Sequence, residues 1–206
     1  MTMIRHIRPA LVLFALLSIL TGLAYPLGLT AVANLVFSHQ AQGSIIIRDG
    51  HPVGSALIGQ NFTSDRYFHP RPSATSGVDP ADPSKSVPTP YNAAVSVGSN
   101  LGPTSRSLVA RVSAGAVAIG ADNPDAIREG WKIPADLVTT SASGLDPDIS
   151  PEAAFFQVRR VALARHLPEM RVHDLVVQMI RQPMMGWLGE PHVNVLALNL
   201  ALDAVQ

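Results

Sequence analysis

The sequence predicts an α+β protein, with a single N-terminal transmembrane helix followed by a mixed-sheet extracytoplasmic domain. Three observations carry this prediction. An uncharged apolar run covers residues 10–29, Asp49-Gly50 separates two apolar segments, and Ser150-Pro151 precedes a run with helical spacing. The run is long enough for a membrane, the Asp-Gly pair is a strong hairpin-turn signal, and Ser-Pro is typical of a capped helix start.

The apolar run predicts a membrane anchor. Its twenty residues, at about 1.5 Å each, match a hydrocarbon core of about 30 Å. Arg5 and Arg8 precede the run, and the next charged residue is Arg48. Positive charge on the first side alone predicts a cytoplasmic N-terminus. Pro26, in the outer half of the run, is expected to kink the helix.

This orientation divides the chain into three parts. We expect residues 1–9 in the cytoplasm, the anchor helix over 10–30, and the body, residues 40–206, in the periplasm, with the anchor in the inner membrane. A cleaved signal peptide is the alternative, because residues 31–33 (AVA) have the small side chains of a cleavage site. The run exceeds the usual signal core of about 7–15 residues, which favours a retained anchor.

The first half of the body is predicted as a hairpin, a long loop and a helix. Ile45–Ile47 and Val53–Ile58 are the predicted hairpin strands. Residues 61–92 are proline-rich and show no periodicity, which is typical of a disordered or functional segment. The helix is expected to begin with Pro103 as its first residue or Thr104 as its cap, with an apolar face that includes Leu108, Val112 and Ile119.

The second half adds two helices and two strands to the prediction. A strand is expected near residues 137–139, a helix from Pro151 with Ser150 as its cap, a helix over 172–182, and a closing strand over 192–202. Together these elements predict a mixed sheet of four short strands with three main helices. Three arginines are predicted to flank the apolar face of the Pro151 helix: Arg159, Arg160 and Arg165.

Composition and motifs exclude several functions. The chain has no cysteine, which removes disulfides, thiol catalysis and cysteine metal sites. Its formal net charge is zero, which argues against nucleic-acid binding. The sequence contains no P-loop, no H-E-x-x-H zinc motif and no G-x-S-x-G nucleophile elbow.

The stretch SASGLDPDISPEAA, residues 141–154, has the composition of an active site. Asp146, Asp148 and Glu152 are candidate ligands for a hard cation or candidate paired carboxylates. The other interpretation is local structure, because Asp-Pro, Gly and Ser-Pro are turn and cap residues. The local interpretation accounts for every unusual residue and is favoured.

Two further segments are candidate binding sites. One is a cluster of aromatic and arginine side chains in the aperiodic loop, either a partner interface or a loop anchored to its own core. Its residues are Arg66, Tyr67, Phe68 and Arg71. The other is residues 96–105, a small, glycine-containing segment before a helix, where backbone N–H groups can hold an anion.

Six segments in order resemble one family, the C subunit (KdpC) of the bacterial potassium-transporting ATPase. They are GSALIGQ, YFHPRPSAT, SNLGPTS, SASGLDPDISPEAA, QVRRVALAR and LGEPHVNVLALNLALD, all after an N-terminal anchor. The resemblance implies a non-catalytic subunit with no cofactor of its own. Its implied partners are the catalytic P-type ATPase subunit, the potassium-path subunit and membrane lipid. It also implies a role in assembly and in potassium uptake.

The resemblance adds a nucleotide hypothesis. The C subunit has been proposed to bind ATP through a serine–glycine segment, and the matching positions here are Ser96, Gly98, Ser99 and Asn100. Val97 stands where the family pattern has glycine, and its branched side chain crowds a phosphate. Two alternatives to the accessory subunit stay open: a secreted hydrolase or metal-binding protein using Asp146, Asp148 and Glu152, and a nucleotide-binding regulator acting at residues 96–105.

Overall fold

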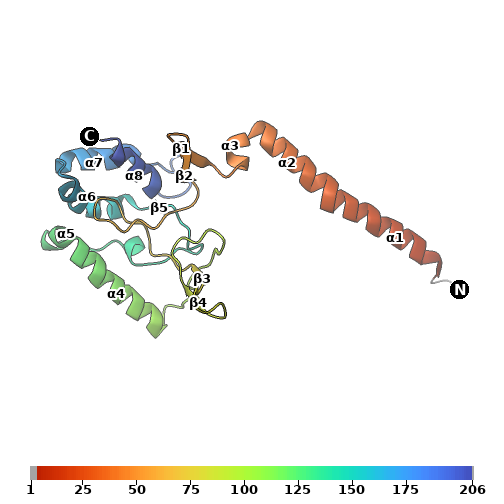
Figure 1. Cartoon of the computed structure of the whole chain (residues 1–206), viewed down its shortest axis with the longest axis horizontal. Helices are drawn as coiled ribbons and strands as arrows, with labels where there is room; N and C mark the ends of the chain where they lie inside the picture. The colour runs from red at the N-terminus through yellow and green to blue at the C-terminus, as the bar shows by residue number, and fades with distance from the viewer. Residues whose placement is uncertain (1–3, 206) are drawn as a thin grey trace. The chain divides into compact units, whose positions relative to one another are not determined.

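The computed structural model describes residues 4–205, so residues 1–3 of the predicted cytoplasmic segment lie outside the described residues. The chain separates into two compact units, residues 1–53 and residues 54–206 (Figure 1). Each unit is considered by itself below.

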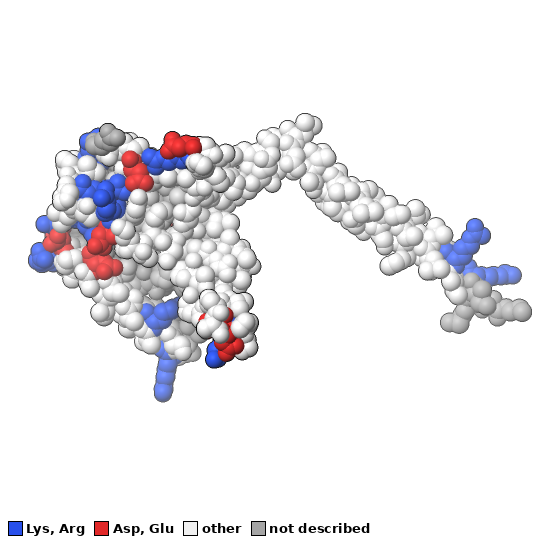
Figure 2. Space-filling model, viewed as in Figure 1, with Lys and Arg blue, Asp and Glu red and all other residues white. Residues whose placement is uncertain are grey.

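The first unit is dominated by one long helix in three consecutive segments. These are α1 (Ile4–Ile19), a π-helical turn (Leu20–Ala24) and α2 (Tyr25–Val36). The candidate membrane span, Arg5–Val36, has 32 residues and contains an 18-residue window with a mean hydropathy of 2.1, so it is longer than the predicted anchor. In Figure 2 its surface is free of charge beyond the basic side chains near its start. The helix is therefore long and apolar enough to cross a membrane.

A π-helical turn lies immediately before Pro26. Proline has no backbone N–H and clashes with the carbonyl four residues earlier, so a regular helix cannot continue unchanged through it. The N–H of Tyr25 bonds to the carbonyl of Leu20, five residues back. The wider turn accommodates the proline within a continuous helix.

The predicted hairpin is present after a short helix α3 (Ser38–Ala41). Its strands are β1 (Ile45–Arg48) and β2 (His51–Ser55), which form a two-stranded sheet. Asp49 and Gly50 have φ angles of 52° and 79°, as a type I′ turn requires. The return strand ends at Ser55 rather than at residue 58, because the Ser55 side chain accepts the N–H of Leu57 at 3.1 Å and turns the chain.

In its described residues, the second unit contains short strands and five α-helices. The strands are β3 (Ser76–Val78), β4 (Ser86–Pro88), β5 (Asp148–Ile149) and β6 (Val193–Asn194). The helices are α4 (Arg106–Asp122), α5 (Pro124–Arg128), α6 (Pro151–Arg165), α7 (Glu169–Met179) and α8 (Val195–Asp203), with a 3₁₀ turn at Ala135–Leu137.

The predicted mixed sheet is wrong. In the described residues, β3 pairs with β4 and β5 pairs with β6, both antiparallel, and each pair stands alone. The predicted strand at residues 137–139 is the end of the 3₁₀ turn and the residues that follow it. The core is instead built by α6 packed on α7 and α7 packed on α8, with Phe68, Phe156 and Leu198 among its fully buried side chains.

The predicted closing strand is wrong for a local reason. Asn194 ends β6 and its side-chain oxygen accepts the N–H of Ala197 at 3.0 Å, which caps α8. The buried residues Val195, Leu198 and Leu202 then recur with helical spacing. The apolar run VLALNLAL is compatible with a strand or a helix, and the asparagine cap selects the helix.

The other helix starts are close to the predictions. Ser150 caps α6 by accepting the N–H of Ala153 at 3.0 Å, as predicted. Helix α4 begins at Arg106, not at Pro103 or Thr104, because the N–H of Ser105 bonds to the carbonyl of Gly102 and holds a turn there. Its predicted inner face is confirmed, since Leu108, Val112 and Ile119 are all partly buried.

Candidate functional site

Two buried side-chain amides hold the backbone of the aperiodic loop inside the core. Asn199 on α8 accepts the N–H of Phe68 at 2.9 Å and donates to its carbonyl at 3.0 Å. Gln157 on α6 accepts the N–H of His69 at 2.7 Å and donates to its carbonyl at 3.2 Å. Each amide replaces the strand partner that this backbone lacks. We call this pair of residues, Asn199 and Gln157, the amide clamp.

Arg160 on α6 reinforces the clamp from within the core. Its guanidinium donates to the carbonyls of Asp65 and Tyr67, at 2.8 and 3.0 Å, and to the side chain of Gln157 at 2.7 Å. Arg160 was predicted to flank the apolar face of this helix, and the structure shows that its side chain is itself buried. Burial lowers its pKa, since an apolar environment disfavours the charged form.

The predicted interface cluster is largely engaged by the domain itself. Phe68 is fully buried, and the Tyr67 hydroxyl bonds to Asp203 at 3.2 Å while Arg165 lies 4.8 Å from the Tyr67 ring centre. Arg66 is the member of the cluster that is exposed. These placements match the interpretation of a loop anchored to its own core.

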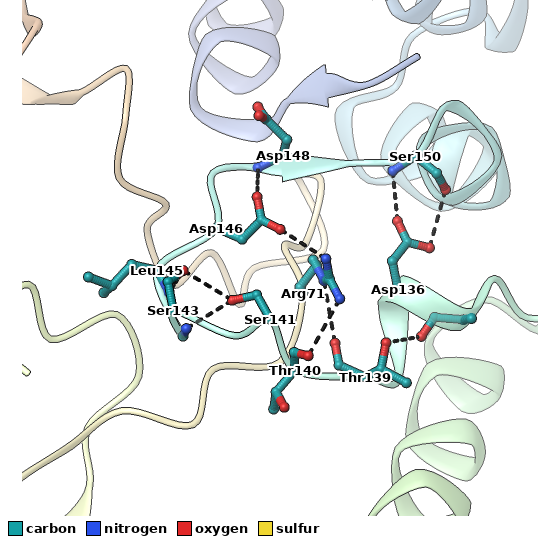
Figure 3. Close-up of polar contacts among 12 residues, drawn as sticks. Arg71, Asp136, Thr139, Thr140, Ser141, Ser143, Leu145, Asp146, Asp148 and Ser150 are labelled. Atoms are coloured by element: carbon teal, nitrogen blue, oxygen red, sulfur yellow. Dashed lines mark hydrogen bonds and ion pairs between the residues drawn. The ribbon is translucent and has the colours of Figure 1, made fainter. Parts of the chain in front are cut away.

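The fourth residue of the cluster, Arg71, joins the loop to the stretch 141–154 (Figure 3). It pairs with Asp146 at 2.9 Å and also faces the carbonyls of Thr139 and Thr140, at 3.5 Å each. The hydroxyl of Tyr91 donates to the Arg71 carbonyl at 2.8 Å. Burial, and secondly the charge of Asp146, raises the pKa of Tyr91, so this hydroxyl keeps its proton.

The serines of the stretch serve as acceptors for nearby backbone N–H groups. Ser141 accepts the N–H of Gly144 at 2.9 Å, and Ser143 accepts the N–H of Leu145 at 3.1 Å. Gly144 has a φ of 68°, and a Cβ at this position would lie 2.6 Å from the carbonyl oxygen of Val97. These are turn contacts of the kind that the local interpretation predicts.

The three candidate carboxylates do not converge on a common point. Asp146 uses one oxygen for Arg71 and the other for the N–H of Asp148 at 3.1 Å. Asp148 accepts from Asn194 at 3.0 Å, and burial raises its pKa in spite of that bond. Glu152 is exposed in the first turn of α6.

These carboxylates line an open groove, which we call the acidic groove. It has a volume of about 520 Å³ and also contains Arg71 and His192. Its acidic residues are Asp136, Asp146, Asp148, Glu152 and Glu190. Asp136 is bonded to the backbone and hydroxyl of Ser150, at 2.7 and 3.2 Å (Figure 3). Within residues 4–205 no group of three or more acidic or histidine side chains has a geometry that holds a metal ion.

The predicted nucleotide segment lies against the same stretch. Ser96 donates to the carbonyl of Ser143 at 3.1 Å, and Ser99 accepts from Thr140 at 3.2 Å. A Cβ on Gly98 would lie 2.7 Å from the carbonyl oxygen of Ala142, so this glycine allows close backbone packing. Asn100 is exposed, and the segment ends six residues before α4 begins.

Sequence reasoning missed the residues that matter most to this geometry. Asn199 and Gln157 were not predicted, and Arg160 was predicted only to flank an apolar face, yet each binds the loop backbone from a helix. A signal was present, because Gln157 and Asn199 interrupt otherwise apolar helical faces. A polar residue at such a position requires a partner.

The fold and site define a class: an α+β protein with one long apolar N-terminal helix, a candidate membrane span, and a loop-rich domain held by side-chain to backbone bonds. A model of the family described as "K+-transporting ATPase, c chain" (KdpC) matches residues 7–204. The chain therefore belongs to the KdpC family.

Curated relatives named "Potassium-transporting ATPase KdpC subunit" cover the same length. The protein from Rhodopseudomonas palustris is 60% identical over 204 residues, which is 99% of this chain and 100% of the relative. Those from Methylobacterium nodulans and Bradyrhizobium diazoefficiens are 60% and 59% identical over 201 residues, or 98% of each chain.

We expect Asn199→Ala to destabilise the domain strongly. The substitution leaves the buried N–H and carbonyl of Phe68 without partners, at a cost of about 2–4 kcal/mol in the free energy of unfolding. Urea unfolding of the full chain in detergent, followed by circular dichroism, measures the change. Asn61→Ala, at an exposed amide, is the control. Equal unfolding midpoints for the two variants would contradict a structural role for the amide clamp.

We also expect His69 to make stability depend on pH. Burial, then the charge of Arg160, lowers the pKa of His69 below the ordinary histidine value of 6.5, so the unfolded chain binds a proton more readily. Its contribution is complete above the unfolded pKa and is lost as the pH falls toward the folded value. Wild-type stability should therefore fall relative to His69→Gln between about pH 7.5 and about pH 5.5. Parallel curves for the two proteins would show that His69 contributes nothing.

Proposed function

We propose that this protein is a non-catalytic accessory subunit of a bacterial, ATP-driven, high-affinity potassium uptake complex, and that it stabilises the assembly. The observation that carries the proposal is identity of about 60% along the whole chain with proteins named as KdpC subunits of potassium-transporting ATPases. Its proposed partners are the catalytic P-type ATPase subunit and the potassium-path subunit, as the resemblance implies. The absence of P-loop and nucleophile motifs from the sequence supports a non-catalytic role.

The proposed location is the bacterial inner membrane, with a single pass, a cytoplasmic N-terminus and a periplasmic domain. The helix Arg5–Val36 supports the single pass by its length and hydropathy. Arg5 and Arg8 at its start, with no charge on its other side before Arg48, support the orientation. Cleavage after Ala33 stays an alternative prediction for the same segment.

ATP binding at Ser96, Gly98, Ser99 and Asn100 stays a prediction. The hydroxyl groups of Ser96 and Ser99 form hydrogen bonds within the domain, and Gly98 is packed against Ala142. A nucleotide at this segment requires either displacement of those contacts or binding through the remaining groups. The proposed accessory role does not depend on it.

The alternative of a secreted hydrolase or metal-binding protein has no supporting observation. Of its three residues, Asp146 is paired with Arg71, Asp148 is bonded to Asn194, and Glu152 is exposed without joining them. Paired carboxylates in catalysis need a shared substrate position. The accessory-subunit proposal is therefore preferred.

We expect the full-length chain to co-purify with its complex. A C-terminal tag on the chain, expressed from its own operon in potassium-starved bacteria, should bring a multi-span membrane subunit and a P-type ATPase subunit out of mild detergent. Mass spectrometry of the eluate identifies the partners and the length of the tagged chain. A soluble tagged protein that is truncated near Ala33 and elutes alone would refute the proposal.

The orientation has its own test, because the chain contains no cysteine and a single introduced thiol is unique. A membrane-impermeant maleimide should label Val78→Cys in intact spheroplasts, since Val78 is exposed in the second unit. His6→Cys, before the apolar run, should react only after lysis. The reverse pattern would show that the charge argument assigns the two sides wrongly.

A further inference from the structure

A pocket of about 440 Å³ is lined by residues of the β3–β4 hairpin and by Arg111 of α4. Figure 1 shows where these elements lie in the fold. Its lining combines hydroxyl side chains, the apolar residues Pro72, Ala74, Val87 and Pro88, and one charged residue, Arg111. The hydroxyl residues include Ser76, Ser99 and Thr140. The lining contains no aspartate or glutamate, unlike that of the acidic groove. The one charged side chain in the lining is therefore a cation.

Arg111 lies on the domain-facing side of α4, where the partly buried residues Leu108, Val112 and Gly115 also lie. Its Nε atom is buried and has no hydrogen-bond partner among the described residues. A buried donor on a charged group is normally paired, because desolvation otherwise costs free energy. The guanidinium of Arg111 therefore lacks a hydrogen-bond acceptor for its buried Nε within the described residues.

The other arginines with partly buried or buried side chains contrast with Arg111. Each of them bonds to a carboxylate or to backbone and amide oxygens of the domain. They are Arg71, Arg159, Arg160 and Arg165. The domain therefore pairs its other inward-facing guanidinium groups. Arg111 is the exception among the described residues.

Two hydroxyl groups add donors to the same pocket. Ser99 accepts a hydrogen bond from Thr140 at 3.2 Å, so its own proton remains available. The hydroxyl of Ser76 has no partner within the described chain. One guanidinium and two hydroxyl donors, with no negative charge nearby in the lining, form a receptor for an oxyanion.

We propose that this pocket receives a single carboxylate side chain from another subunit of the complex, a step that rests on the proposed function. One guanidinium matches one carboxylate in charge and in its bidentate geometry. A phosphate monoester would bring excess negative charge to a pocket with a single cation. The apolar residues Val87 and Pro88, which also line the pocket, give the apolar contact that surrounds such arginines in protein interfaces.

Substitutions on α4 test the proposal in the tagged complex. Arg111→Gln should reduce the co-purified partner subunits about tenfold, because the partner carboxylate loses its cation. Arg111→Lys should retain an intermediate amount, since it keeps the charge without the planar fork. Arg106→Gln is the matched control, because Arg106 is exposed on the same helix and does not line the pocket. Circular dichroism of each purified chain establishes that it folds.

Chemical footprinting of the wild-type protein tests the proposal without any substitution. Phenylglyoxal modifies accessible guanidinium groups, and peptide mass spectrometry locates the product. Arg111 should be modified in the detergent-purified chain and protected about tenfold in the intact complex, as a buried ion pair requires. Vesicles of phosphatidylglycerol and a solution of sodium phosphate, each with the chain alone, test for a phosphate ligand instead.

The outcomes separate this inference from the proposed function. Partner subunits that co-purify equally with wild type and Arg111→Gln, or equal modification of Arg111 in chain and complex, overturn the inference and leave the accessory role standing. Protection by phosphate or vesicles but not by the complex also overturns it. A wild-type chain that brings no partner refutes the proposed function itself.

Discussion

The amide clamp is the interaction on which the second unit depends. The backbone of Phe68 and His69 enters a core that offers no neighbouring strand, and an unpaired buried N–H or carbonyl is costly. Asn199 and Gln157 satisfy all four groups from two different helices. The same bonds fix the position of the fully buried Phe68 ring, so α6, α8 and the loop are held together by one polar arrangement.

The remaining loops follow the same principle, because the strands of this unit are too short to supply many backbone partners. Arg160 binds the carbonyls of Asp65 and Tyr67, and Arg71 ties the loop to the stretch that contains Asp146. Side-chain to backbone bonds thus replace a sheet as the source of order. These bonds give the aperiodic loop, residues 61–92, a defined backbone path. Polar residues of the stretch 141–154, which resemble a catalytic site, make some of these bonds.

The sequence predicted what local chemistry determines. The apolar run, the Asp49-Gly50 turn and the Ser150 cap each depend on a few neighbouring residues. The turn and the cap are confirmed, and the run forms one long helix that fits a membrane span. The mixed sheet and the closing strand were wrong. An apolar run such as VLALNLAL is compatible with both strand and helix periodicity, and the cap formed by Asn194 selects the helix. The amide clamp joins residues 131 and 88 positions apart, a pairing that no local pattern specifies. Arg111 was missed because only the folded structure shows that its buried Nε lacks a hydrogen-bond partner among the described residues.

The internal use of polar groups determines how variants of this protein should be interpreted. Loss of assembly on substitution of Tyr67 or Phe68 would report a damaged core, because both side chains contact their own domain. Arg66 and Arg111 are different: the first is exposed and the second lacks an internal acceptor for its buried Nε. An effect on assembly that spares folding is therefore informative at these positions. Arginines that are paired within the domain maintain the fold, whereas an arginine without an internal acceptor marks a surface available to a partner. The density of polar residues does not make this distinction.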